Sequence, residues 1–558
     1  MSQNQPLEYG QDSSHVWFQF APSRSLKTRY ISRLTGPLPK TDAEKGPHLH
    51  IVAGYISCLL LVIIGHIRDF FGPYFRGGYD HLRQFDGYAP IYTFSDSFYT
   101  RRLLVRGVDC GVRPTTGVPG RNIILLDRAS DDHNKTFYLT GTRTDALNLS
   151  SYNYLGFAQS QGPCADAVEN TIQENGLSSN VSATSAACIS QNELEDILAD
   201  FIGKEASIIF SMGFSTNTSI LPSLVSKGSL IISDELNHAS IRVGCRLSGA
   251  SIVSFRHNDM KSLEERLRTA ISQGQLPSHR PWSKILVIVE GLYSMEGTIC
   301  DLPSLVALRR RYKFNLFVDE AHSIGALGSQ GKGVCDYFGI DSSEVDVLMG
   351  TLTKSFGANG GYIAATRSMI QKLRATNPAI AYGEPASPAI ITQISISLQI
   401  IQGKMMLGQG QERLQRLAFN SRYLRLGLKR LGFIVYGHDD SPVIPLLVIN
   451  PAKLTMLSRL MLDRKIAVVV AAVPVVPLAL CRVRLCASAA HCLEDLERTL
   501  MAFDEIGTLL DIKISTKAAT GALIPPQLRT RKIKHSPPRW NVNDVMKYGV
   551  ADAKQPFT

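Results

Sequence analysis

Short apolar runs alternate with amphipathic stretches between residues 151 and 397. The amphipathic segments at 193–202, 259–272 and 302–311 have a helical period. The apolar runs have the length and branching of buried strands and lie at 207–210, 230–233, 285–291, 314–321, 345–350 and 361–365. This alternation predicts a mostly parallel sheet with helices on both faces, and such sheets bind ligands beyond the carboxyl ends of their strands.

The pattern changes after about Leu398. A long basic helical stretch is followed by short apolar runs at 432–437, 443–449, 466–473 and 483–491. We therefore expect a large domain at 151–397 and a smaller C-terminal α+β domain at 398–515. An N-terminal subdomain is expected at 85–150, and a basic, weakly ordered tail at 516–558.

The N-terminal region combines a polar arm with one apolar segment. Residues 1–48 are polar and lack the features of a signal peptide. The segment Ile51–Ile67 contains only one ionisable residue, and aromatic residues follow it at 70–75. This predicts a membrane anchor or interfacial segment at 49–84, with a buried core helix as the alternative because about 17 residues is short for a bilayer span.

Composition favours a large folded enzyme. Of 558 residues, 44% are hydrophobic and 19% are charged. The net charge of +11 suggests no nucleic acid, because zinc-finger spacing, an RNP motif and a basic helix are missing from the sequence. Basic residues gather near both ends, where they suit either an anionic lipid surface or solvated tails. The ten cysteines form no CxxC pair, which argues against a metal site or disulfide framework and for a reducing compartment.

One lysine is surrounded by small and hydroxyl residues in the segment GTLTKSFGANGGYIAA, residues 350–365. Lys354 fits an amine that carries pyridoxal 5'-phosphate (PLP) as a Schiff base, because imine formation needs a site where burial and nearby positive charge lower the pKa of the amine. By itself, the segment is more simply explained as a surface lysine in a glycine-rich turn.

Two ionisable residues follow the expected buried strand in FVDEAHSIGALG, residues 317–328. A buried Asp319 carboxylate needs a cationic partner, and the protonated pyridine nitrogen of PLP is such a partner. His322 is placed to bond the phenolic oxygen of the ring. A structural aspartate with a satisfied histidine is the alternative, but Lys354 lies only 35 residues downstream.

Further candidates follow other expected strands. His238 in SDELNHASI would lay its imidazole against the cofactor ring, and the N–H groups of Gly213 and Phe214 would hold the phosphate at a helix N-terminus. Ser294 and Thr351 are hydroxyls that would bond the oxygens of the cofactor. Each signal is weak alone, but together they predict a PLP enzyme with Lys354, His238 and Asp319 as catalytic residues.

These segments resemble the alpha-oxoamine synthases, and within that family the fungal form of the branch that uses L-serine. The resemblance covers about residues 85–515 and rests on SYNYLGFA, SDELNHAS, VEGLYSMEG, DEAHSIGALG, GTLTKSFGANGGYI, YGHDDSPV and SAAH. It implies the aspartate-aminotransferase-like fold (fold type I), with a seven-stranded sheet. It also implies the roles given above, and that Asn153 and Arg484 approach the carboxylate of the amino acid.

The resemblance implies a reaction and a setting. L-serine condenses with a long-chain acyl-CoA to give 3-ketosphinganine, with release of CoA and carbon dioxide. The chain would work as a heterodimer with a lysine-less first subunit at the endoplasmic reticulum membrane, with its catalytic domain facing the cytosol.

The chain departs from the family pattern at a few places. No basic residue occurs in 176–195, where Ser182 and Gln191 stand at positions of an expected Arg and His. Pro385 replaces a usual hydroxyl residue, and PVVP at 474–477 replaces Pro-Ala-Thr-Pro. We therefore expect a diverged paralogue that retains cofactor binding. There are two alternative functions. The protein would be a related enzyme that uses another acyl donor in a sphinganine-analogue pathway, or a PLP-binding regulatory subunit of low activity.

Overall fold

The computed structural model describes residues 30–34, 36–38, 46–75, 80–93, 95, 97–132, 134, 136–178, 189–473 and 475–515. Its largest sheet has seven strands in the order β4-β10-β9-β8-β7-β5-β6, which confirms the expected fold class. The strands are β4 (Ala206–Phe210), β5 (Leu230–Asp234), β6 (Ser251–Phe255), β7 (Ile285–Glu290), β8 (Asn315–Asp319), β9 (Val347–Thr351) and β10 (Gly361–Ala365). Strands β5, β6, β7, β8 and β9 are parallel to one another, whereas β10 runs antiparallel to both of its neighbours, β4 and β9.

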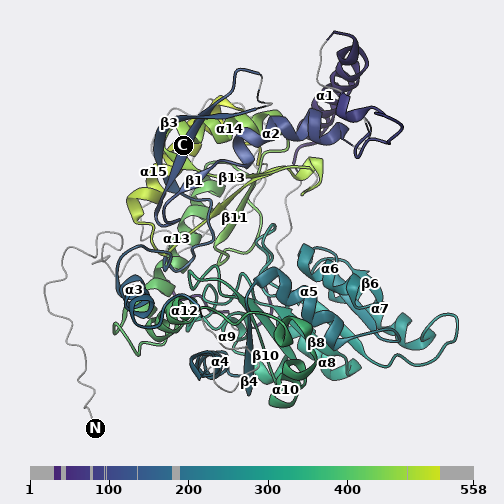
Figure 1. The fold of residues 1–558 in the computed structure, drawn as a ribbon, viewed down its shortest axis with the longest axis vertical. Coiled ribbons are helices and arrows are strands. Elements are labelled where there is room, and N and C mark those ends of the chain that lie inside the picture. Colours follow the sequence, from purple (N-terminus) through teal and green to yellow (C-terminus); the bar gives the residue numbers. More distant parts are fainter. Residues whose placement is uncertain are drawn as a thin grey trace, which may run out of the picture.

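Successive residues of each central strand are buried in opposite directions, which explains the continuous apolar runs. In β7, Leu286 and Ile288 belong to one hydrophobic cluster, whereas Val287 and Val289 belong to another. Helices α5 (Gly213–Leu224), α6 (Ala239–Leu247) and α10 (Arg367–Thr376) contribute to the first cluster. Helices α4 (Ile189–Ile202), α7 (Met260–Gln273) and α8 (Leu302–Tyr312) contribute to the second, so helices cover both faces (Figure 1).

Strand β6 was not among the expected runs. It lies at the edge of the sheet, and most of its side chains are exposed. Its sequence, SIVSF, therefore lacks the continuous apolar character of its buried neighbours.

The C-terminal part forms a three-stranded sheet of β11 (Val443–Leu447), β14 (Arg482–Cys486) and β13 (Val469–Ala471). Its helices are α13 (Gln409–Arg430), α14 (Pro451–Asp463) and α15 (Leu493–Leu509). The strand expected at 432–437 is wrong, because this segment makes only a single bridge from Val435 to Leu446.

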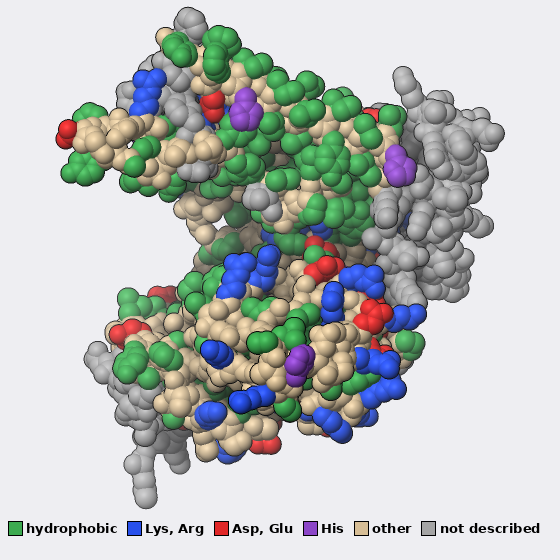
Figure 2. All heavy atoms as spheres, turned by 90° about the vertical axis from the view of Figure 1, so that its right-hand side faces the viewer, with side chains coloured by type: hydrophobic (Ala, Val, Ile, Leu, Met, Phe, Trp, Pro, Cys, Tyr) green, Lys and Arg blue, Asp and Glu red, His purple; other side chains and the backbone are tan. Residues whose placement is uncertain are grey.

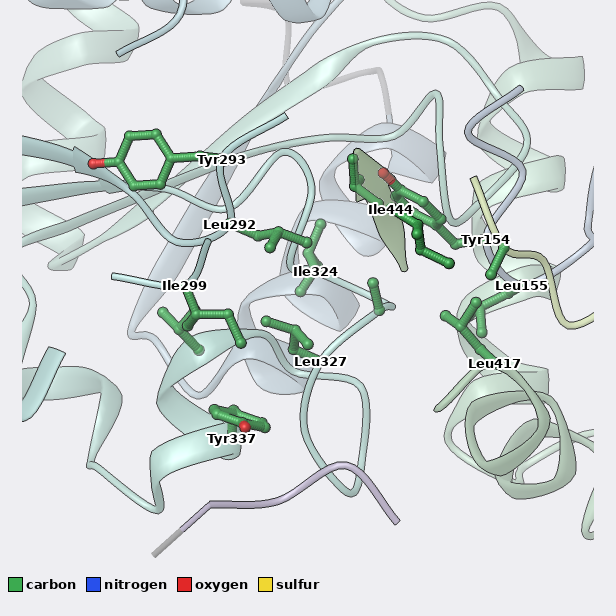
Figure 3. Packing of buried hydrophobic residues seen from close by; sticks show 14 of the residues in the cluster. Tyr154, Leu155, Leu292, Tyr293, Ile299, Ile324, Leu327, Tyr337, Leu417 and Ile444 are labelled. Carbon is green, nitrogen blue, oxygen red and sulfur yellow. The ribbon is translucent and has the colours of Figure 1, made fainter. Parts of the chain in front are cut away.

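A second sheet joins the N-terminal segment to this part. Strands β2 (Asn122–Ala129) and β3 (Tyr138–Asn148) form an antiparallel pair, and β12 (Ile466–Ala467) lies parallel to β3. The core then continues between the large sheet and the C-terminal part. Figure 3 shows Tyr154, Ile324, Leu417 and Ile444 from four distant segments within this one cluster.

Helix α1 (His48–Phe75) extends the expected apolar segment to 28 residues. Among the described helices it alone is both long and apolar enough to cross a membrane. The polar arm before residue 30, the basic tail at 516–558, Ser182 and Pro474 lie outside the described residues.

Candidate active site

A cavity of about 260 Å³ lies at the carboxyl ends of β5, β7, β8 and β9. Because these strands are parallel, the residues that follow them meet at one edge of the sheet. Seven predicted residues line this cavity: Gly213, Phe214, His238, Asp319, His322, Thr351 and Lys354. Its lining also contains residues that the sequence did not single out, namely Met212, Asn217, Ser240, Glu290, Ala321, Met349 and Thr353.

Lys354 is not a surface lysine in a turn. Its side chain is accessible only in part, from the cavity that it lines. Burial of the amine lowers the pKa of Lys354 to about 8; the Asp319 and Glu290 carboxyl groups oppose this shift, and the Arg484 guanidinium adds to it. The neutral fraction of the amine near physiological pH is therefore a minority, but far larger than that of an ordinary lysine.

Asp319 ends β8 and is 4% exposed. Its carboxylate accepts hydrogen bonds from the Asn217 side-chain amide at 2.8 Å and from the Ala321 backbone N–H at 2.9 Å. These two donors stabilise its charged form. The side-chain oxygen of Asn217 is buried without a partner among the described residues, so the site retains an unused polar atom beside this carboxylate.

Glu290 ends β7 in register with Asp319, so the two acidic residues lie side by side on one face of the sheet. One Glu290 oxygen accepts the backbone N–H of His238 at 2.5 Å. Burial and the neighbouring Asp319 raise the pKa of Glu290 well above its ordinary value. Glu290 thus keeps its proton to a higher pH than an ordinary glutamate.

Both predicted histidines lie at the cavity as neutral bases. The backbone N–H of Ser240 donates to His238 Nδ1 at 3.2 Å, which leaves the hydrogen of the neutral ring on Nε2. His322 Nδ1 lies 2.8 Å from the Tyr154 hydroxyl. Burial and the Lys354 amine lower the pKa values of both histidines.

The N-terminus of α5 faces the cavity without a side-chain cap. The first N–H groups of a helix have no partner within the helix, and they form an anion site. A Cβ atom on Gly213 would lie 2.8 Å from Thr351 Oγ1. A larger residue would crowd Thr351 here, so glycine allows the free N–H groups of this helix end, which can hold a phosphate, to lie close to Thr351.

Arg484 and Tyr152 lie near Lys354, outside the residues that line the cavity. The Arg484 guanidinium lies 4.5 Å above the Tyr152 ring, and its buried Nε atom has no partner among the described residues. The same ring lies 5.5 Å from the Lys354 amine and 4.9 Å from the His322 ring. The sequence does not predict a role for Tyr152, although its motif SYNYLGFA carries part of the family resemblance, because only the adjacent Asn153 is assigned a role in that motif.

Three predicted residues, Arg484, Asn153 and Ser294, are not part of the cavity lining. The Asn153 amide donates to the Pro119 carbonyl at 3.1 Å and accepts from the Ala158 N–H at 3.2 Å. Ser294 lies in the turn after β7, outside the cavity lining. Their contacts with substrate and cofactor stay predictions.

Gln191, at the position of an expected histidine, is 2% exposed. Its side chain donates to Glu195 at 3.2 Å and accepts the Ala386 N–H at 3.2 Å. It therefore joins α4 to the segment that contains Pro385, so two departures from the family pattern lie next to each other.

The fold and the cavity define a PLP-dependent enzyme of the aminotransferase type. The family model for aminotransferase class I and II matches residues 144–503. The chain is 53% identical to "Serine palmitoyltransferase 2" of Schizosaccharomyces pombe over 96% of this chain and 90% of that protein. It is 48% identical to the protein of the same name from Kluyveromyces lactis, over 98% and 94%.

A solved serine palmitoyltransferase with PLP bound as an internal aldimine has a similar fold, with a TM-score of 0.64 and 26% identity. The similarity covers 75% of this chain and 98% of that one. The chain belongs to the serine palmitoyltransferase family, which is PLP-dependent.

Proposed function

We propose that this protein is the catalytic subunit of a serine palmitoyltransferase, which condenses L-serine with a long-chain acyl-CoA to 3-ketosphinganine, CoA and carbon dioxide. The observation that carries the proposal is the Lys354 amine, whose pKa is lowered to about 8 in a cavity that it shares with Asp319. The choice of substrates is supported by the names of the fungal relatives.

The family resemblance supplies the cofactor contacts, and all of the residues except Ser294 line the cavity. Asp319 would pair with the pyridine nitrogen, and the His238 ring would lie against the cofactor. Lys354 would hold PLP through its amine, His322 and Ser294 would bond the ring oxygen, and Gly213, Phe214 and Thr351 would hold the phosphate. When bound, PLP withdraws electrons from the substrate α carbon.

The protein's own groups bind the amino acid and move its proton. The His238 Nε2–H is available for the serine carboxylate, because Nδ1 accepts from Ser240. Arg484, held over Tyr152, offers a guanidinium for the same carboxylate, and Asn153 is the second residue proposed near it. Lys354 would accept the α proton of serine at Nζ and return a proton to the product, since its pKa of about 8 suits both directions.

We also propose a lysine-less first subunit as the partner in a heterodimer, and a location at the endoplasmic reticulum membrane with the catalytic domain facing the cytosol. Helix α1 supports membrane attachment, because apolar side chains cover most of its surface. Co-purification of the two subunits from endoplasmic reticulum membranes tests the heterodimer and its location.

The activity is tested with the purified complex. We expect visible absorbance from lysine-bound PLP, a change in that spectrum with L-serine, and labelled 3-ketosphinganine from labelled serine and palmitoyl-CoA. Lys354→Ala should abolish all three signals, whereas the exposed Lys261→Ala should leave them unchanged. Bound PLP without a serine response would contradict the proposed substrate.

A further inference from the structure

The turn between β7 and α8 presents Met295 to the C-terminal part of the chain. Two backbone hydrogen bonds close this turn, because the Tyr293 N–H donates to the Thr298 carbonyl and the Gly297 N–H donates to the Tyr293 carbonyl, both at 2.9 Å. The Nε2 atom of His257 lies 2.8 Å from the Thr298 hydroxyl and ties the turn to the segment after β6. The turn is therefore held firmly by the large domain.

The same turn packs closely against the C-terminal part. The Gly297 carbonyl accepts the His438 N–H at 2.9 Å, and a Cβ atom on Gly297 would lie 2.5 Å from the Val443 carbonyl oxygen. Figure 2 shows one face of the molecule, which is hollowed between an upper part that contains α1 and a lower part that contains the large sheet. Contacts of the turn thus join the large sheet to the three-stranded sheet.

Two arginines of β14 reach this turn. They are separated by one residue, so both side chains leave the strand on the same face. Arg482 donates to the Met295 carbonyl at 2.9 Å and lies 3.5 Å from the Glu296 carboxyl group. Arg484 donates from Nη1 to the Met295 sulfur at 3.3 Å. Adjacent residues of one turn therefore receive the two guanidinium groups, one through a carboxyl group and the other through a thioether.

The other groups in contact with Arg484 are uncharged. Its guanidinium lies 4.5 Å above the Tyr152 ring and interacts with the Cys486 thiol. Burial raises the pKa values of Tyr152 and Cys486, so both stay neutral at physiological pH. Within the part of the chain that the structure describes, Arg484 forms no ion pair, and its buried Nε atom has no hydrogen-bond partner.

The thioether explains how Arg484 is held without being neutralised. Charges that are withdrawn from water are normally paired, so a cation without a carboxylate partner suits a site where a ligand supplies the anion. Sulfur in a thioether is a weak acceptor and carries no charge. We propose that Met295 is a positioning residue, which fixes the direction of the Arg484 guanidinium and leaves its charge free for the serine carboxylate. The inference rests on the proposed function, in which Arg484 receives that carboxylate.

The role is tested with three substitutions of Met295 in the complex with the partner subunit. The absorbance of bound PLP is titrated with L-serine. Met295→Glu places a carboxylate against Arg484 and should raise the dissociation constant of serine at least about tenfold. Met295→Leu removes the acceptor and should raise it about threefold. Met295→Gln supplies a neutral acceptor on a side chain of similar length and should stay within about twofold of the wild-type protein.

Two controls accompany these variants. Met456→Glu, at an exposed methionine of α14, should leave serine binding unchanged. L-serine methyl ester keeps the amine and the hydroxyl of serine but lacks the charged carboxylate. Its dissociation constant should therefore be the same in the three Met295 variants as in the wild-type protein.

The outcomes separate this role from the proposed function. Equal losses for serine and its methyl ester would show that the substitutions disturb packing of the whole site, and would overturn the positioning role. Unchanged serine binding in Met295→Glu would overturn it as well, as would an equal loss in Met295→Leu and Met295→Gln. A wild-type protein that binds PLP and does not respond to serine would overturn the proposed function, and this inference with it.

Discussion

The shifted Lys354 amine makes a quantitative prediction about cofactor loading. An ordinary lysine has a pKa of 10.5, and that of Lys354 is about 8. At a pH below both values, the difference corresponds to about 300-fold more neutral amine. Only the neutral amine attacks the aldehyde of PLP. Loading of the apo-protein should therefore rise with pH to a midpoint near 8.

Stopped-flow absorbance measures this rate on mixing apo-protein with PLP between pH 6.5 and 9.5. Nα-acetyl-lysine, which keeps its side-chain amine free, is measured in parallel and supplies the pH dependence of PLP itself. A midpoint near that of the free amine would refute burial as the main cause of the shift.

Two variants test the assigned charges by the sign of their effects. Asp319→Asn removes a carboxylate that favours the protonated amine, so the midpoint should move to lower pH. Arg484→Gln removes a repelling cation, so the midpoint should move to higher pH. Movement of both midpoints in the same direction would refute the electrostatic account.

Three other substitutions follow from contacts. Gly213→Ala places a Cβ atom 2.8 Å from Thr351 Oγ1 and should weaken PLP binding at least about tenfold by equilibrium dialysis, with the thermal midpoint of the apo-protein as a folding control. Tyr152→Leu should raise the KM for serine about tenfold, whereas Tyr152→Phe should keep it, because the ring face supports Arg484; equal loss in both would implicate the hydroxyl. Arg425→Met removes the buried guanidinium that donates to the carbonyls of Ser441 and Val443. It should lower the free energy of unfolding by about 3–5 kcal/mol in a urea titration, and an unchanged urea midpoint would contradict this structural role.

The large sheet was predictable because both faces of its central strands are buried. That condition produces runs such as ILVIVE in β7, which stand out in any sequence. It fails at β6, whose edge position leaves polar residues in the strand. It also misleads at 432–437, where Phe433 and Ile434 are buried by packing without forming a ladder.

The site residues divide in a similar way. Asp319 ends a buried strand, and His322 and Lys354 come three residues after the ends of β8 and β9, so their chain positions already place them at the carboxyl edge. For residues in irregular segments, the position in the chain does not predict which side chain lies at the site. The Tyr152 ring lies near the Lys354 amine, whereas Asn153 donates to the Pro119 carbonyl, and only the path of the folded backbone decides between them.

The paired carboxyl groups show why residue type alone does not define a site. Glu290 and Asp319 end adjacent strands in register, and the sequence offers no reason to assign different charges to them. The fold supplies the reason: Asp319 receives two hydrogen bonds, whereas burial and Asp319 itself raise the pKa of Glu290. A fully charged Glu290 would favour protonated Lys354 more strongly, so the raised pKa of Glu290 helps to keep the amine reactive.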